Sequence, residues 1–232
     1  MAQSPGPGLP VKRPSRETLQ DRIYHSLRDS LITGKFVPGQ VLSNRVLAEA
    51  MGTSPTPLRE ALRRLVSERG LVVLHNGSVA VPPFSPVQFS DLRRVRCIVE
   101  GEAAERGARL IRGSGIESLE KCCTAMRDAF ESGTRERYLL ANKRFHFTFY
   151  RKCDSPILLS IIDSLWLQLG PYLNLSFARE AFEFGIAHQA RAVDAIKRGD
   201  AGDARDAIVR DIIESGDFIL SNAAEIADPS GT

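Results

Sequence analysis

The chain has 232 residues, of which 43% are hydrophobic, so it is long enough for two unequal domains with buried cores. Its net charge of +3 is uneven, because residues 1–80 carry 11 Lys and Arg against 6 Asp and Glu, whereas residues 81–232 carry 20 against 22. There is no apolar signal segment, no apolar run near the ~20 residues of a membrane span, and no CxxC pair, which argues against a secreted, membrane-bound or disulfide-rich protein. We therefore expect a cytoplasmic protein with a basic, phosphate-facing N-terminal part.

The first segment, residues 1–15, is rich in Pro and Gly and carries basic side chains, so we expect a disordered arm. Apolar residues then recur at helical spacing over residues 17–32, which predicts a helix that ends at Gly34. A Pro-Gly turn follows and leads into a short extended segment.

Residues 47–65, LAEAMGTSPTPLREALRRL, have the pattern of a short helix, a tight turn and a longer helix. Gly52 suits a left-handed helix end, Ser54 suits the N-cap of the second helix, and the proline after it suits the first helical turn. This is the pattern of a helix-turn-helix, whose second helix lies in the major groove of DNA. We expect Ser54, Thr56 and Arg59 to face bases and phosphates.

Two short β-prone runs, residues 71–74 and 78–81, flank the dipeptide Asn76-Gly77. Asn-Gly between such runs is the strongest short signal for a β-hairpin. A hairpin directly after a helix-turn-helix is a wing, and a glycine at its tip allows close contact with the DNA. The alternative is an ordinary surface turn.

An ordered series of motifs runs through residues 17–83: G-x-x-x-P-G-x-x-L, then LA, then TP-x-REAL-x-x-L, then GL and a glycine-tipped wing. This series resembles the winged-helix domain of the GntR family of bacterial transcription regulators. The resemblance implies a winged helix-turn-helix domain at residues 16–83 that binds a double-stranded DNA operator. It implies DNA contacts from Arg45, Ser54, Thr56, Arg59, Asn76 and Gly77. Many members have Arg where this chain has Pro55, so one contact of the family is missing.

Beyond residue 86 the sequence consists almost entirely of helix patterns separated by short Gly, Pro and Asp breaks, which predicts an all-helical bundle. The last residues, 224–232, are expected to form a flexible tail. The chain as a whole is therefore predicted to be mainly α. The bundle is expected to contain about six helices, near residues 86–112, 115–131, 134–153, 156–169, 176–198 and 201–223.

Three further motifs occur in order in this part: R-x-x-x-E at Arg96 and Glu100, an N-x-x-F-H motif that ends at His146, and A-I-x-x-G-D at residues 195–200. Together they resemble the FCD ligand-binding domain of the fatty-acid-regulator-like branch of the GntR family. The resemblance implies that residues 86–223 form an effector-binding and dimerisation domain.

Many FCD domains hold a divalent metal through an Asp or Asn, a His one turn later and two further His. In this chain the corresponding positions are Asn142, His146, Gln189 and Asp211. One His, one carboxylate and two amides are a weak set for zinc, although oxygen-preferring ions are conceivable. Two alternatives follow: a divalent metal held by Asn142, His146 and Asp211, or a metal-free polar pocket whose four side chains hydrogen-bond a ligand or each other.

Arg96 is expected to bind a carboxylate of the effector, because a guanidinium forks onto that group through two parallel hydrogen bonds. The alternative is an ion pair with Glu100, four residues later on the same helix. The predicted effector-binding residues are Arg96, Asn142, His146, Gln189 and Asp211.

The predicted function is a homodimeric regulator, in the usual sense of the family a repressor, that binds an inverted-repeat operator and responds to a small organic acid. One alternative is a constitutive DNA-binding protein with a degenerate effector pocket. The other is a metal-dependent enzyme that uses His146 and Asp211 as acid and base. No activated nucleophile or full catalytic metal set supports that enzyme, so we expect no enzyme.

Overall fold

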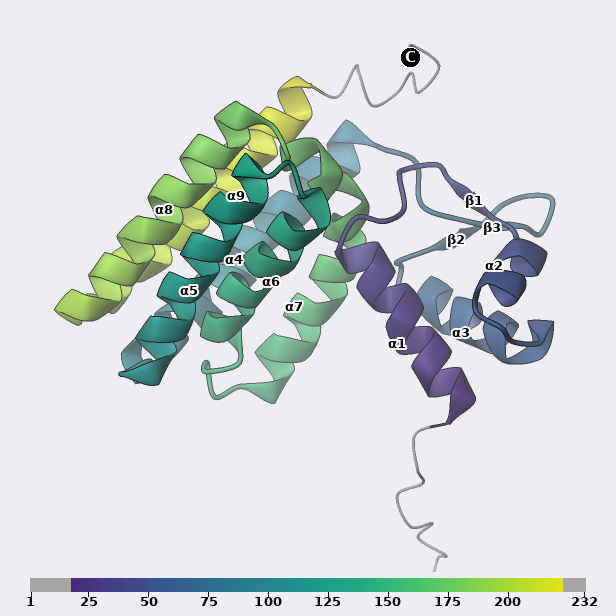
Figure 1. The fold of residues 1–232 in the computed structure, drawn as a ribbon, viewed down its shortest axis with the longest axis horizontal. Helices are drawn as coiled ribbons and strands as arrows, with labels where there is room; N and C mark the ends of the chain where they lie inside the picture. Colours follow the sequence, from purple (N-terminus) through teal and green to yellow (C-terminus); the bar gives the residue numbers. More distant parts are fainter. Residues whose placement is uncertain (1–17, 223–232) are drawn as a thin grey trace, which may run out of the picture.

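The computed structural model describes residues 18–222, so the expected arm (1–15) and tail (224–232) lie outside the described residues. A helical bundle lies beside a smaller domain that contains the strands, and helix α1 (Leu19–Ile32) runs between them (Figure 1). The predicted mainly-α fold, a winged helix-turn-helix followed by a helical bundle, is confirmed.

The smaller domain contains α1 and five further elements: β1 (Val41–Leu42), α2 (Asn44–Ala50), α3 (Pro55–Ser67), β2 (Val72–Val73) and β3 (Val79–Ala80). Strands β2 and β3 form the predicted hairpin. The sheet has a third strand, because β1 pairs antiparallel with β3 and gives the strand order β1-β3-β2. The extended segment expected after the Pro-Gly turn is therefore a sheet edge, which anchors the base of the wing.

Helix ends in this domain follow from local chemistry. Thr18 and Asp21 form a capping box at the start of α1, so the first free N–H groups of that helix are bonded. Gly52 ends α2 with a φ of 58°, as its left-handed role predicts. Ser54 is the N-cap residue of α3, but its side chain makes no capping hydrogen bond. The predicted N-cap position is therefore confirmed, but the Ser54 hydroxyl is not bonded to the helix end.

The bundle contains six α-helices within the described residues, in agreement with the predicted number: α4 (Pro86–Leu110), α5 (Ser114–Glu131), α6 (Arg135–Tyr150), α7 (Pro156–Leu169), α8 (Arg179–Arg198) and α9 (Ala201–Ser221). The sequence did not predict η1, a 3-10 segment at Gly170–Ser176 between α7 and α8. Pro171 has no N–H to continue the α-helical ladder, and the chain tightens there.

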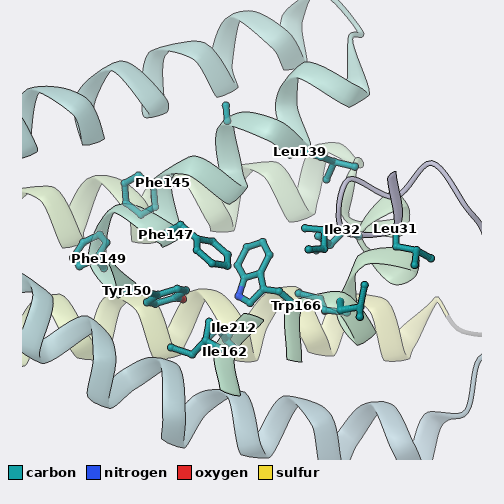
Figure 2. Close-up of a cluster of buried hydrophobic side chains, with 14 of the residues drawn as sticks. Leu31, Ile32, Leu139, Phe145, Phe147, Phe149, Tyr150, Ile162, Trp166 and Ile212 are labelled. Carbon is teal, nitrogen blue, oxygen red and sulfur yellow. The ribbon is translucent and has the colours of Figure 1, made fainter. Parts of the chain in front are cut away.

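A single hydrophobic cluster joins the two domains. Leu31 and Ile32, at the end of α1, belong to the same buried cluster as Trp166 of α7. Figure 2 shows Trp166 between Phe147 on one side and Ile32 on the other. The smaller domain is therefore attached to the bundle through its first helix rather than through the chain connection alone.

The segment Pro156–Asn174 has 19 residues and is apolar enough to cross a membrane by length and composition, with 44% of it buried. The expectation that no apolar run approaches the length of a membrane span was therefore wrong for this segment. Its apolar composition corresponds to packing in the bundle, since Ile162, Trp166 and Leu167 are buried.

Candidate functional site

The N-terminal end of α3 has an exposed polar face and a buried apolar face. Ser54, Thr56 and Arg59 are exposed, whereas Leu58 and Leu62 are buried against the rest of the domain. The Arg59 Nε lies 3.5 Å from the backbone oxygen of Pro55 on its own helix. The amphipathic pattern of α3 thus leaves these three side chains together on the solvent side.

The wing tip lies on the same side of the domain. Asn76 accepts a hydrogen bond from the Ser78 backbone N–H at 3.0 Å, and Gly77 has a φ of 79°, which a side chain would strain. A groove of about 310 Å³ between α3 and the wing is lined by Arg59 and Gly77, among others. Arg45, on α2, is exposed as well. The structure therefore brings two of the six predicted DNA-contacting residues, Arg59 and Gly77, to one groove, and the other four do not line it.

The other arginines of α3 have partners in the fold. Arg63 pairs with Glu60 at 2.6 Å. Arg64 pairs with Glu68 at 3.2 Å and lies 3.6 Å above the Tyr24 ring of α1. Burial and the hydrogen bond to Glu68 raise the pKa of Tyr24 to about 12, so its hydroxyl stays a donor. Arg64 therefore holds α1 on α3.

A cavity of about 40 Å³ lies inside the bundle, with room for about one or two waters or a very compact group. Residues from α4, α6, α7, η1 and α9 enclose it. Four of the five predicted effector-binding residues line it, and Gln189 is bonded to two of them. The lining residues are Arg96, Tyr138, Asn142, His146, Trp166, Leu169, Leu173, Asp211, Ile212 and Ser215.

One half of the cavity wall is a cluster around Asp211. Gln189 donates from Nε2 to Asn142 Oδ1 at 2.9 Å and to Asp211 Oδ2 at 3.5 Å. His146 Nε2 lies 3.1 Å from the same Asp211 oxygen, and Ser215 donates to Asp211 Oδ1 at 3.3 Å. Three helices, α6, α8 and α9, therefore meet at this carboxylate.

A second cluster centres on Glu100, which is fully buried and is bonded to the cavity-lining residues Arg96 and Trp166. Arg96 donates to it from Nε at 2.5 Å and from Nη2 at 3.1 Å. Tyr150 and Trp166 donate to Glu100 Oε2 at 2.5 and 3.1 Å. Burial alone would lower the pKa of Arg96, but the Glu100 carboxylate raises it, so the guanidinium stays charged. Arg96 thus lines the cavity and also forms the ion pair with Glu100.

The two clusters are linked through His146 and Tyr150, since the imidazole Nδ1 lies 3.1 Å from the Tyr150 hydroxyl. Burial, followed by the charge of Glu100, raises the pKa of Tyr150 well above its usual value. The Tyr150 hydroxyl donates to Glu100 and lies within hydrogen-bond distance of the His146 ring. Polar contacts of 2.5–3.1 Å therefore run from Glu100 through Tyr150 to His146 and Asp211, of which the last two line the cavity.

These residues do not fit a divalent metal. Within residues 18–222 there is no group of three or more His, Cys, Asp or Glu side chains that could hold one. His188, next to the third ligand position, instead lies 2.9 Å from Glu214. The Gln189 amide nitrogen, which has no lone pair to offer a metal, contacts both Asn142 and Asp211.

The sequence did not predict three polar groups of this site: Tyr138 and Ser215, which line the cavity, and Tyr150, which contacts His146 and Glu100. Tyr138 and Tyr150 lie four residues before Asn142 and four residues after His146, respectively, on the same face of α6. Ser215 follows Asp211 by four residues on α9. The four-residue spacing from Asn142, His146 and Asp211 is the signal in the sequence that could have identified them.

Comparison with known protein families gives two matches. Residues 19–81 match the family described as "Bacterial regulatory proteins, gntR family". Residues 91–214 match the FCD domain. The first match includes α3 and the wing, and the second includes every cavity-lining residue except Ser215.

Similar proteins carry the same arrangement over most of their length. HTH-type transcriptional regulator McbR of Escherichia coli (strain K12) is 32% identical over 157 residues, which are 68% of this chain and 70% of that protein. The gluconate operon transcriptional repressor of Bacillus licheniformis is 25% identical over 97% of this chain and 93% of its own length. The solved structure of E. coli McbR/YncC has a TM-score of 0.77 at 27% identity, covering 90% of this chain and 97% of that one.

Proposed function

The chain belongs to the gntR family of bacterial regulatory proteins and carries an FCD domain, and we propose that it is a homodimeric, cytoplasmic repressor controlled by a small organic acid. Transcription regulation through DNA follows from the family. The sign of regulation, the dimer and the acid are the proposal. Relatives named as repressors, including the gluconate operon repressor, support the sign.

The observation that carries the DNA-binding proposal is the groove between α3 and the wing. Arg59 and Gly77 line it, and Ser54 and Thr56 lie exposed at the start of α3. In this geometry α3 enters the major groove, Arg59 reaches a base edge or phosphate, and the wing tip approaches the backbone. Two such heads in a twofold dimer would bind an inverted repeat.

The acid is proposed to bind at Arg96. Glu100 takes the Nε and Nη2 edge of that guanidinium, which leaves the Nη1 end for a second carboxylate. The His146 imidazole and the Ser215 hydroxyl lie on the same cavity wall and offer further polar contacts to the acid. A cavity of about 40 Å³ is too small for most organic acids, so binding must move its walls.

That movement has a route to the DNA-binding domain. Leu169 and Leu173 line the cavity and flank Gly170, the first residue of η1. A Cβ on Gly170 would overlap the backbone of Leu31 and Ile32, so η1 and the end of α1 touch backbone to backbone. Displacement of η1 by the acid would therefore shift α1 and, with it, the winged helix. The acid would then favour one of two dimer arrangements that differ in their affinity for the operator.

A constitutive DNA-binding protein is the second candidate. The small volume of the cavity and the mutual bonding of its polar groups favour it. It differs from the first candidate in one respect: no small molecule would change its operator affinity.

The experiment uses an operator selected in vitro from random duplexes and measures binding by fluorescence anisotropy. Arg59→Ala should weaken operator binding by roughly tenfold or more, because a base-edge or phosphate contact is lost. Arg106→Ala is the matched control, since Arg106 is exposed on α4 and paired with Glu102. Equal binding by the Arg59→Ala variant and the wild type would remove α3 from the DNA interface.

A further inference from the structure

The carboxamide of Gln189 stands where side chains from three helices converge. Gln189 projects from α8, Asn142 from α6 and Asp211 from α9. Its Nε2 lies 2.9 Å from Asn142 Oδ1 and 3.5 Å from Asp211 Oδ2, and the residue is only 2% exposed. Bulk water therefore does not compete for these bonds.

The chemistry of the neighbours fixes the orientation of the amide. An ionised carboxylate only accepts hydrogen bonds, so Asp211 must face the NH₂ group of Gln189 rather than its oxygen. Rotating the amide would set its oxygen against the Asn142 and Asp211 oxygens, with no donor between them. The edge of Gln189 that faces the cluster thus presents hydrogens, not a lone pair.

The remaining residues keep the spacing of a metal site. Two ligand atoms on one ion, with bonds of about 2.1 Å, lie roughly 3.0–3.4 Å apart. His146 Nε2 and Asp211 Oδ2 lie 3.1 Å apart. They are a suitable pair, but within the described residues no third His, Cys, Asp or Glu joins them. Position 189, whose side chain contacts both Asn142 and Asp211, is where a third His or acidic ligand would come from.

We propose that the Gln189 carboxamide replaces a divalent metal ion in this cavity. Its N–H groups hold the Asn142 and Asp211 oxygens together as a cation would, and they exclude cations from the His146–Asp211 pair. The effector consequently meets hydrogen-bonding groups instead of a metal. One substitution, Gln189→His, converts the cavity into a metal site, because histidine has a similar reach and offers a ring nitrogen. This inference goes beyond the proposed function, and its test requires neither an operator nor an effector.

The test measures Co²⁺ binding by visible absorption, metal content by elemental analysis and melting temperature with and without EDTA, on full-length protein purified without chelator. The wild type should contain no stoichiometric metal, give no Co²⁺ absorption band, and melt at the same temperature with Co²⁺ or EDTA. Gln189→His should bind one Co²⁺ per chain, with a visible band and a higher melting temperature that EDTA reverses. Adding Asp211→Asn to that variant should abolish the band.

Two controls separate the cavity from its surroundings. Gln189→Ala removes the amide without adding a ligand and should bind no Co²⁺. The double variant His188→Gln with Gln189→His should keep the new site, because His188 is directed to Glu214.

Wild-type metal binding that Asp211→Asn abolishes would overturn the proposal, as would a folded Gln189→His variant that takes up no Co²⁺. If Gln189→His does not fold, as judged by circular dichroism, Gln189→Glu takes its place. It keeps the side-chain volume and adds a carboxylate to the His146 imidazole and the Asp211 carboxylate. The three ligands should bind Mn²⁺. A folded Gln189→Glu variant without bound Mn²⁺ contradicts the proposal equally.

Discussion

Glu100 is the residue on which the interior of the bundle depends most. It is a fully buried carboxylate that receives hydrogen bonds from Arg96, Tyr150 and Trp166, which come from α4, α6 and α7. A buried ion pair adds little stability over an apolar replacement, but removal of one partner leaves an uncompensated charge. Glu100 therefore fixes the relative positions of three helices that form the cavity.

We predict that Glu100→Ala lowers the free energy of unfolding by about 3–5 kcal/mol, because the buried Arg96 charge and two further donors lose their acceptor. Urea denaturation followed by circular dichroism measures this difference. Glu102→Ala is the control: Glu102 lies two residues later, is exposed and pairs with Arg106 at 2.6 Å. It should cost about 0.5 kcal/mol. Similar losses for the two variants would contradict the role of Glu100.

Sequence reasoning reached part of this arrangement. Asn142 and His146 were predicted to share a helix face, and Arg96 was predicted to meet either a ligand carboxylate or Glu100; the structure has Arg96 beside the cavity and paired with Glu100. Spacing along one helix predicts such neighbours. The convergence of Tyr150 and Trp166 on Glu100 depends on how three helices pack, and no local spacing encodes it.

At the scale of elements, α1 and η1 connect the two domains. Arg28 of α1 pairs with Asp163 of α7 at 2.8 Å, and Asn174 of η1 donates to the backbone oxygen of Gly34. Lys143 of α6 reaches Asp29 of α1 at 3.0 Å. The sequence predicted α1 and α7 as separate helices but not η1, because a 3-10 segment has no amphipathic period of its own.

We predict that Asn174→Ala weakens the coupling between effector binding and operator affinity. Loss of a hydrogen bond worth about 1 kcal/mol at the η1–α1 contact should reduce the effector-induced change in operator affinity by roughly fivefold. Operator affinity without effector should stay within about twofold, since no DNA-facing residue changes. Anisotropy titrations with and without the acid give both quantities. Asn222→Ala, which removes a bond within α9 at 2.8 Å, is the control; an equal loss of response there would speak against η1 as the route.

At the scale of the molecule, charge is divided between the domains. Residues 1–80, which contain the groove formed by α3 and the wing, carry an excess of basic side chains. Residues 81–232 are slightly acidic. A positive excess in the part of the chain that contains the gntR match favours approach of that part to phosphates. The sequence was sufficient for this inference because net charge needs no three-dimensional information.

We predict that Arg45→Ala reduces the steepness of the salt dependence of operator binding. The slope of log K against log salt changes by about 0.9 for each phosphate contact, so a dimer that loses Arg45 twice should lose about 2 units of slope. Anisotropy at several salt concentrations measures the slope. A change near 1 would indicate one chain per operator, and an unchanged slope would take Arg45 away from the phosphates.

The measurement that tests the account most directly is operator affinity in the presence of a small carboxylate that raises the melting temperature of the protein. We predict that such an acid weakens operator binding by roughly tenfold or more in the wild type, within the usual range of coupling free energies. His146→Ala should bind the operator normally and give no response, because His146 lines the cavity and not the groove between α3 and the wing. An acid that stabilises the protein while leaving operator affinity unchanged would contradict the account and identify a constitutive DNA-binding protein.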